Sequence, residues 1–398
     1  MKSNEQKYIN KRFRQGKLHS IAYYILRIFP IKKSRIVFTT FEGQGGYACN
    51  PRYIAEELLK NKDEYELIWL VNDISKTFPD GIRKVKNTYL NRAFYLSTAK
   101  VWIDNTRKPL GTKKRKGQYY IQTWHGEWAF KPVGRLRGDL FPKIAELVSL
   151  EDSKMIDYLI YSSKIFETYY KDMILYDGKI VRTGMPRVDI LKTKRDSNYK
   201  LIRRQYNISD DSKILIYAPT FRGGGQSGKR EIQQQISTLD FKRLKTAMES
   251  KFGGEWYIFL RLHPQLAAIL DKMDTNENES FIIDVSQADD MNELISAANA
   301  FVTDYSSAAF EAMLIKIPTF IYADDIDAYV KDRGEFVCDI YNLPCRISTD
   351  NEGLEACIRE FEFASYEEKS DDLAREYNVL FDGAAGERVV QLIKNIRG

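Results

Sequence analysis

The chain has 398 residues, of which 43% are apolar and 13% aromatic. This length favours two domains of about 150–200 residues each, and the composition excludes a disordered chain. The four cysteines show no CxxC spacing, and there are only three histidines. The sequence therefore predicts no zinc or other metal site, no cofactor and no disulfide framework.

The net charge of +6 is unevenly distributed. Residues 1–33 carry nine Lys or Arg and one acid, Glu5, a net charge of +8 that leaves −2 for the other 365 residues. The apolar run 21–26 in this arm is too short to cross a bilayer, which needs about 20 residues. No small-residue cleavage site follows it, which argues against a secretory signal. The Lys, Tyr and Ile residues of this arm are typical of a segment that binds an anionic membrane surface. A solvated tail that ends in a packing helix explains the same residues equally well.

Strand and helix patterns alternate after this arm. In the first half, strands are expected at 35–40, 67–71, 101–103, 119–121, 158–161 and 180–181, with a glycine-rich loop at 41–46 and a helix at 50–59. A second basic cluster, residues 107–116, is expected in a loop. It would face a membrane or an anionic acceptor, and the simpler alternative is that it is solvated. Residues 192–212 are polar and helical and are expected to connect two domains.

The alternation restarts in the second half, with strands expected at 214–217, 256–260, 281–283, 301–302 and 319–322. The fold class is therefore α/β, with two Rossmann-like domains facing a cleft. Ligands are expected at the carboxyl ends of the strands. The expected division is a basic amphipathic arm (1–33), an N-terminal domain (34–194), a C-terminal domain (195–370) and a helical C-terminal segment (371–398).

Two histidines follow expected strands. His125 lies in Gln-Thr-Trp-His-Gly, between Trp124 and Gly126, and imidazole is the usual general base for a hydroxyl nucleophile. His263 lies two residues after Arg261 and precedes a proline. The two basic side chains together are expected to bind a diphosphate. The alternative for each is a histidine that serves packing alone.

Two further segments at strand ends carry anion-binding groups. Thr220 and Arg222 precede three glycines, and an arginine can meet a phosphate through two hydrogen bonds. Asp304, Ser306 and Ser307 precede a helix whose free amides attract anions. Solvation of Arg222 and ordinary helix capping by Asp304 or a serine are the simpler interpretations.

Several function classes are excluded. The chain has no Gly-x-x-x-x-Gly-Lys-Ser/Thr loop, no dinucleotide-binding glycine fingerprint and no Gly-x-Ser-x-Gly elbow. It has no basic stripe interleaved with stacking aromatics, so no nucleic-acid partner is expected.

At these motifs the chain resembles the CDP-glycerol glycerophosphotransferases, which prime and polymerise teichoic acids. The resemblance runs from about residue 34 to 394, through the segments Gln122–Gly126, Thr183–Asp189, Tyr217–Arg222, Arg261–Pro264, Thr303–Ser307 and Asp382–Gly383 with Arg388. It implies a GT-B-like fold with an N-terminal acceptor domain and a C-terminal CDP-donor domain. The partners would be CDP-glycerol or CDP-ribitol, a polyprenyl-linked saccharide acceptor and the cytoplasmic face of the membrane, peripherally.

By this resemblance, His125 would activate the acceptor hydroxyl. His263 would hold the donor diphosphate together with the other donor-side residues, Thr220, Arg222, Arg261, Asp304, Ser306 and Ser307. Trp124, Gly126 and Glu127 would border the acceptor. The chain departs from the polymerases in having Glu127 and Trp128 where they carry Thr-Pro, and in lacking their large N-terminal extension. It thus looks more like the compact priming or capsule-type members.

The hypothesis is phosphoryl transfer from CDP-glycerol to a hydroxyl of a membrane-linked saccharide or polyol-phosphate acceptor, with release of CMP, in teichoic acid or capsule-type polymer synthesis. Such a reaction needs positioning and charge neutralisation more than covalent chemistry, and the basic groups could supply these without a metal. A CDP-ribitol transferase, a nucleotide-sugar glycosyltransferase and a non-catalytic binding subunit remain as alternatives.

Overall fold

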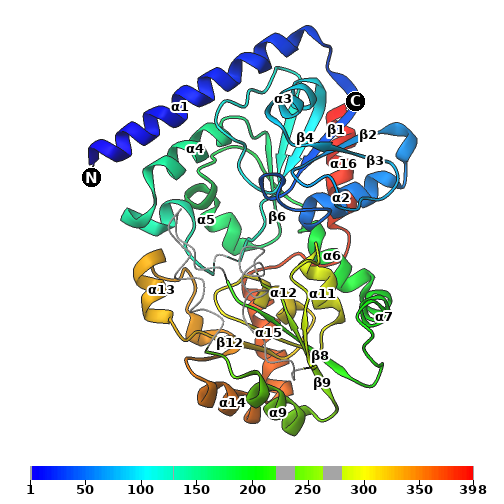
Figure 1. The fold of residues 1–398 in the computed structure, drawn as a ribbon, viewed down its shortest axis with the longest axis vertical. Helices are drawn as coiled ribbons and strands as arrows, with labels where there is room; N and C mark the ends of the chain where they lie inside the picture. The colour runs from blue at the N-terminus through cyan, green and yellow to red at the C-terminus, as the bar shows by residue number, and fades with distance from the viewer. Residues whose placement is uncertain (1, 129, 221–237, 263–279, 398) are drawn as a thin grey trace. The chain divides into compact units, whose positions relative to one another are not determined.

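The computed structural model describes residues 2–128, 130–220, 238–262 and 280–397. The chain divides into two compact units (Figure 1). Unit 1 consists of Met1–Glu127, Val133–Asp189 and Val379–Gly398, and unit 2 of Trp128–Pro132 and Ile190–Asn378. Each unit contains one parallel sheet with helices packed against it, so the prediction of two α/β units is confirmed.

Unit 1 is built on a seven-stranded sheet in the order β3-β2-β1-β4-β5-β6-β7. Its strands are β1 (Lys32–Thr39), β2 (Glu66–Val71), β3 (Ile82–Lys86), β4 (Ala99–Asp104), β5 (Tyr119–Gln122), β6 (Tyr158–Tyr161) and β7 (Ile180–Arg182). Its helices are α1 (Lys2–Ile25), α2 (Cys49–Leu59), α3 (Tyr89–Thr98), α4 (Lys143–Ser153), α5 (Lys164–Ile174) and α16 (Ala385–Arg397), with short 3-10 turns η1 (Leu26–Ile28), η2 (Phe41–Gly43), η3 (Lys62–Glu64) and η4 (Gly134–Leu140). The boundary to unit 2 falls within α6 (Pro186–Thr193).

Unit 2 is built on a six-stranded sheet in the order β10-β9-β8-β11-β12-β13. Its strands are β8 (Lys213–Ala218), β9 (Trp256–Leu260), β10 (Ile282–Asp284), β11 (Ala300–Thr303), β12 (Thr319–Tyr322) and β13 (Arg346–Ser348). Its helices are α7 (Arg195–Gln205), α9 (Phe241–Phe252), α11 (Met291–Ala297), α12 (Ala308–Leu314), α13 (Ile326–Arg333), α14 (Asn351–Arg359) and α15 (Phe363–Glu376), with a 3-10 turn η6 (Ile340–Asn342).

The sheet of unit 1 is covered on both faces, which is why its central strands are continuous apolar runs. Ile36 and Phe38 of β1 lie in a buried cluster that also contains Ile54 of α2 and Ile393 of α16, so these two helices cover one face. On β4, the indole of Trp102 donates to the carbonyl of Leu96 in α3 (2.8 Å), and α3 packs against β1 and β4. The C-terminal helix therefore belongs to the core of unit 1.

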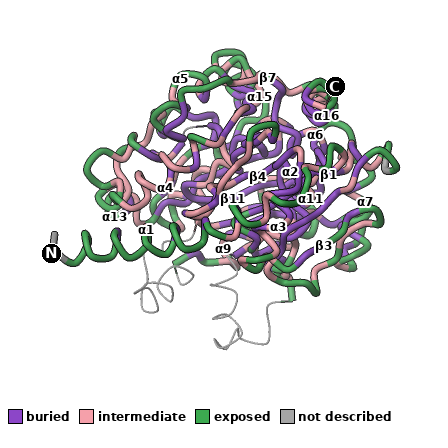
Figure 2. The backbone as a smooth tube through the Cα atoms, turned by 90° about the horizontal axis from the view of Figure 1, so that it is seen from above, coloured by how far each residue is buried: buried purple, intermediate pink, exposed green. Residues whose placement is uncertain are grey.

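Helix α1 packs on the rest of unit 1 through one narrow stripe of buried residues. Ile9, Gly16, Ser20 and Tyr23 are buried, at spacings that place them on one side of the helix. Gly16 allows the closest approach, because a Cβ added there would lie 3.0 Å from the Cβ of Leu110. Most of the remaining surface of α1 is exposed (Figure 2). Among the described residues, no helix has the length and apolar character needed to span a bilayer.

The strand order indicates at which edge of each sheet a ligand is expected, called here the ligand edge. In unit 1 the chain order reverses direction between β1 and β4, and in unit 2 between β8 and β11. The carboxyl ends of strands at such a switch point are where open α/β sheets bind ligands. Register pairs Thr39 with Asp104 and Asp104 with Gln122, so β1, β4 and β5 end side by side. Ala218 pairs with Thr303 in the same way.

Two strands were missed by the sequence analysis. Strand β3 (Ile82–Lys86) and strand β13 (Arg346–Ser348) each lie at the edge of a sheet. Strand β3 reads Ile-Arg-Lys-Val-Lys and β13 reads Arg-Ile-Ser, so polar residues interrupt the apolar run that identifies the other strands. In β3, only two of the five residues are buried.

Candidate active site

His125 lies beside the switch point of unit 1, in the loop that follows β5, the strand next to β4. Its Nδ1 is 2.6 Å from the backbone carbonyl of Asn105, which follows the neighbouring strand β4. A carbonyl oxygen only accepts hydrogen bonds, so Nδ1 must carry the proton. The basic lone pair of the neutral ring is then on Nε2, which is the arrangement a general base requires.

The His125 loop is held from several sides. The side-chain amide of Asn50, fully buried at the start of α2, donates to the carbonyl of Trp124 (3.0 Å). Its Oδ1 accepts from the backbone N–H of Arg187 (3.0 Å), and the guanidinium of Arg187 donates to the carbonyl of His125. Sequence reasoning missed Asn50 and Asn105 altogether. It included Arg187 only as part of a motif, because buried polar residues on distant segments carry no local signal.

Strained backbone is concentrated around this histidine. Phe41, Glu42, Cys49 and Trp124 have φ between 47° and 58°, in the left-handed region that bulky residues rarely adopt. The ring of Phe41 lies 5.5 Å from that of His125, and the ring of Trp124 lies 4.5 Å from it. Each such residue costs on the order of 1–3 kcal/mol, and this kind of strain typically persists at functional sites.

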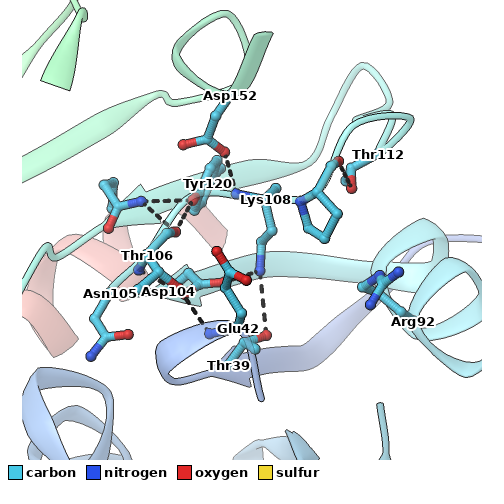
Figure 3. A network of polar contacts seen from close by, with 12 residues as sticks. Thr39, Glu42, Arg92, Asp104, Asn105, Thr106, Lys108, Thr112, Tyr120 and Asp152 are labelled. Atoms are coloured by element: carbon cyan, nitrogen blue, oxygen red, sulfur yellow. Dashed lines mark hydrogen bonds and ion pairs between the residues drawn. The ribbon is translucent and has the colours of Figure 1, made fainter. Parts of the chain in front are cut away.

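A buried ion pair supports the loop that carries Asn105. Lys108 Nζ is 2.5 Å from Asp104 Oδ2 and also donates to Thr39 Oγ1 (3.3 Å) (Figure 3). The other carboxylate oxygen of Asp104 accepts from the amide of Thr106 (2.9 Å). These contacts fix residues 104–108 at the end of β4, and with them the carbonyl that binds His125.

Asp152 completes this network from α4. Its Oδ1 accepts from the backbone N–H of Lys108 (2.9 Å), while Oδ2 is buried without a hydrogen-bond partner in the described contacts. Burial raises the pKa of Asp152 to about 7, and its hydrogen bond from Lys108 only partly opposes this. Burial, followed by the Asp104 carboxylate, also raises the pKa of Glu42.

The residues expected beside the acceptor divide into two groups. His125 and Gly126 are partly exposed, whereas Trp124 and Glu127 are buried. The carboxylate of Glu127 accepts from the backbone N–H of Ser162 (2.7 Å) and from its hydroxyl, at the end of β6. Glu127 therefore ties the His125 loop to the next strand, which favours a positioning role over direct contact with an acceptor.

In unit 2, the switch point brings together Thr220, after β8, and Asp304, after β11. Both carboxylate oxygens of Asp304 are 2.8 Å from the backbone N of Thr220, and Oδ1 also accepts from the N–H of Tyr305 (2.5 Å). A buried carboxylate held by backbone donors orders both loops. This geometry favours a positioning role for Asp304.

Ser306 and Ser307 lie at the start of α12, which has seven residues. Ser306 Oγ accepts from the N–H of Ala308 (3.3 Å), and Ser307 makes no side-chain capping bond. Both serines are partly exposed, beside Thr220 on the neighbouring strand end. The structure thus joins Thr220 to Asp304, and Ser306 and Ser307 follow Asp304 in the chain.

Arg261 follows β9, the strand next to β8. Its backbone N–H donates to the carbonyl of Tyr217 (2.9 Å), and Nη1 donates to the carbonyl of Ser286 after β10. Burial lowers its pKa, while the carboxylates of Asp290 and Asp289 act in the opposite direction. Arg261 therefore places a positive group at the same edge as Thr220. Two other predicted residues, Arg222 and His263, lie outside the described residues.

A family model for CDP-glycerol:poly(glycerophosphate) glycerophosphotransferases matches residues 21–395. The chain belongs to this family. The teichoic acid poly(glycerol phosphate) polymerase of Staphylococcus epidermidis is 31% identical over 383 residues, covering 91% of this chain and 51% of the relative. The teichoic acid glycerol-phosphate transferase of Staphylococcus aureus is 28% identical over 396 residues, covering 94% and 97%. This chain thus spans about half the length of the first relative and nearly all of the second.

The fold of this glycerophosphotransferase family member also matches a solved structure. The wall teichoic acid polymerase TagF, as a histidine-to-asparagine variant soaked with CDPG, aligns with a TM-score of 0.80 and 27% identity. The match covers 99% of this chain and 97% of that one. The expected GT-B-like fold class is thereby confirmed. Within the described residues, no group of three or more His, Cys, Asp or Glu could hold a metal ion.

The raised pKa of Asp152 predicts a pH dependence of stability. An unfolded aspartate titrates near pH ~3.9, so the folded chain binds this proton more tightly than the unfolded chain. The free energy of unfolding should therefore fall as pH rises from about 4 to about 7, by on the order of 2–4 kcal/mol. Asp152→Asn keeps an acceptor for the Lys108 amide and removes the titration.

Urea unfolding of Asp152→Asn should thus match that of the wild type near pH ~4 and show greater stability near pH ~8. Asp139→Asn, at an exposed aspartate of the same unit, is the matched control and should follow the wild type throughout. Parallel pH profiles for the wild type and Asp152→Asn would contradict the assignment.

Proposed function

We propose that this chain transfers glycerol phosphate from CDP-glycerol to a hydroxyl of a membrane-linked saccharide or polyol-phosphate acceptor and releases CMP. The observation that carries the proposal is the hydrogen bond from His125 Nδ1 to Asn105, which leaves the lone pair on Nε2 at the ligand edge of unit 1. Membership of the glycerophosphotransferase family and relatives that handle glycerol phosphate support it. The pathway would be synthesis of teichoic acid or a capsule-type polymer.

In the proposed reaction, the acceptor oxygen forms a bond to the β-phosphorus of CDP-glycerol. The bond from that phosphorus to the bridging oxygen breaks, CMP leaves with the bridging oxygen, and the hydroxyl proton passes to Nε2 of His125. Little covalent chemistry is required of the protein, so positioning and neutralisation of charge dominate. His125 would act on the acceptor hydroxyl, and the donor-side residues would bind the diphosphate.

The donor diphosphate is assigned to the switch point of unit 2. Arg261, Arg222 and His263 would supply positive charge or hydrogen bonds. Thr220, Ser306 and Ser307 would add hydroxyl donors, with Asp304 holding the Thr220 loop in place. In this assignment the reaction needs no metal, because these donors neutralise the transferring phosphate.

The donor is tested by identifying the released nucleotide. Incubation of the full chain with an acceptor lipid and, separately, CDP-glycerol, CDP-ribitol or UDP-sugars should give CMP from CDP-glycerol. CMP from CDP-ribitol alone would make the chain a ribitolphosphotransferase, and UDP release would make it a glycosyltransferase. Binding of CDP-glycerol without any release would indicate a non-catalytic subunit.

Removal of either assigned histidine should abolish most turnover. General acid–base catalysis contributes about 10²–10⁴-fold, so His125→Ala should lower the rate of CMP release by that factor. His263→Ala should lower it by orders of magnitude through loss of diphosphate stabilisation. His19→Ala, at an exposed histidine on α1, is the matched control and should retain wild-type activity. Near-native turnover in His125→Ala or His263→Ala would remove that residue from its role.

Peripheral attachment at the cytoplasmic face of the membrane is assigned to α1. Lys7, Lys11 and Lys17 are exposed, and so are Leu18 and Ile25, at 65% and 60%. Basic side chains beside exposed apolar ones suit anionic lipid headgroups, at about 1 kcal/mol per Lys or Arg. These side chains lie on the surface of α1 outside its buried stripe.

Co-sedimentation with vesicles tests this attachment without truncating the chain. The triple variant Lys7→Gln, Lys11→Gln, Lys17→Gln should bind phosphatidylglycerol vesicles about 100-fold more weakly than the wild type. A matched triple variant at exposed lysines of unit 2, Lys242→Gln, Lys331→Gln, Lys369→Gln, should bind as the wild type does. Equal losses in both variants would leave α1 without this role.

A further inference from the structure

The loop after β4 contains hydrogen-bond donors that the described part of the chain does not use. Nε and Nη2 of Arg107 are buried and have no hydrogen-bond partner there. The same holds for Nδ2 of Asn105, a residue with 0% exposure. Leaving a buried donor unpaired costs about 1–3 kcal/mol, and more when it is charged. Three such donors within three residues point to a ligand that supplies acceptor oxygens.

These donors lie beside the proposed catalytic base. The carbonyl of Asn105 accepts from His125, and its Oδ1 accepts from the N–H of Phe41 (2.8 Å), so only the amide nitrogen is unpaired. The guanidinium carbon of Arg107 is 5.0 Å from the ring of Trp124, whose ring is 4.5 Å from that of His125. The guanidinium and the imidazole therefore contact the same indole.

The charge of Arg107 is incompletely balanced by its surroundings. The carboxylates that act on it are Asp152 and Glu42, followed by the Tyr120 hydroxyl, and neither carboxylate forms an ion pair with it in the described structure. Burial lowers the pKa of Arg107 and raises that of Asp152 to about 7, so Asp152 is only partly charged near neutral pH. Lys108, the adjacent cation, is already paired with Asp104.

We propose that Arg107 and Asn105 form a subsite for the phosphate of an acceptor that ends in glycerol phosphate. A guanidinium presents its donors in a planar fork that matches phosphate oxygens. In a glycerol phosphate end, three carbon atoms separate the phosphate from the terminal hydroxyl. A phosphate bound at Arg107 would therefore direct that hydroxyl toward His125.

This inference rests on the proposed function and deepens it. It assigns the acceptor as a phosphate-bearing polyol end rather than a bare saccharide hydroxyl. Arg107 is partly exposed, so a ligand can approach the loop from solvent. Because its Nε and Nη2 are buried, the guanidinium would turn outward to pair them with phosphate oxygens. The amide of Asn105 is buried too, so it would reach the phosphate after Arg107 turns outward.

Calorimetric titration with glycerol 3-phosphate tests the subsite without turnover. A charge-assisted hydrogen bond is worth about 1.5–3 kcal/mol, so Arg107→Gln should weaken binding by about 10- to 100-fold. Arg107→Lys should bind with intermediate affinity, because it keeps the charge and loses the fork. Glycerol should not displace the bound glycerol 3-phosphate.

Two arginine variants serve as controls for this titration. Arg83→Gln, at an exposed position of β3, and Arg359→Gln, at an exposed position of unit 2, should bind glycerol 3-phosphate as the wild type does. Equal binding by the wild type and Arg107→Gln overturns the proposal. A loss in Arg261→Gln as large as that in Arg107→Gln also overturns it, because the phosphate would then occupy the donor site.

Turnover with paired acceptors then tests the assigned role. With CDP-glycerol, Arg107→Gln should raise KM about 10- to 100-fold for a lipid-linked disaccharide carrying glycerol phosphate. KM for the same lipid without glycerol phosphate should not change, and an equal increase for both acceptors overturns the assignment. If the wild type releases no CMP with either acceptor while the titration behaves as expected, the proposed function fails and the phosphate subsite is retained.

Discussion

The buried ion pair of Lys108 and Asp104 fixes the geometry on which the unit 1 site depends. Charges with side chains only 2% exposed are costly to bury, and that cost is offset here by hydrogen bonds to Thr39 and Thr106 as well as by the pair itself. The result is a rigid turn after β4, whose carbonyl at Asn105 receives Nδ1–H of His125. Removing either Lys108 or Asp104 would leave the other charge buried and unpaired. The turn after β4 therefore depends on the whole network.

Much of the fold follows from sequence pattern alone. The central strands are short, apolar and β-branched because both faces of each sheet are covered, so their positions were predicted. Strands β3 and β13 escaped detection because polar residues interrupt their apolar runs, whereas the edge strands β7 and β10 keep two adjacent apolar residues. Helix α16 could not be placed from sequence, since nothing local shows that residues 385–397 return to pack against α2.

The candidate site was only partly predictable. His125, Thr220, Arg261 and the Asp304–Ser307 segment are visible because each follows a strand, and register then brings strand ends together. The tautomer of His125 depends on Asn105, twenty residues earlier, and its loop depends on Asn50 and Arg187. Such long-range polar contacts have no periodicity, so a sequence alone does not reveal them.

The carboxylates at the two ligand edges have different roles. In unit 2, Asp304 binds backbone amides and leaves the positive charge of Arg261 at the same edge. In unit 1, Asp104 neutralises Lys108, whereas Arg107 forms no ion pair with a carboxylate of the described residues. If Arg107 were neutralised in the way Lys108 is, this edge would suit a neutral hydroxyl alone. One unpaired guanidinium beside a histidine suits a substrate that carries both a hydroxyl and an anion.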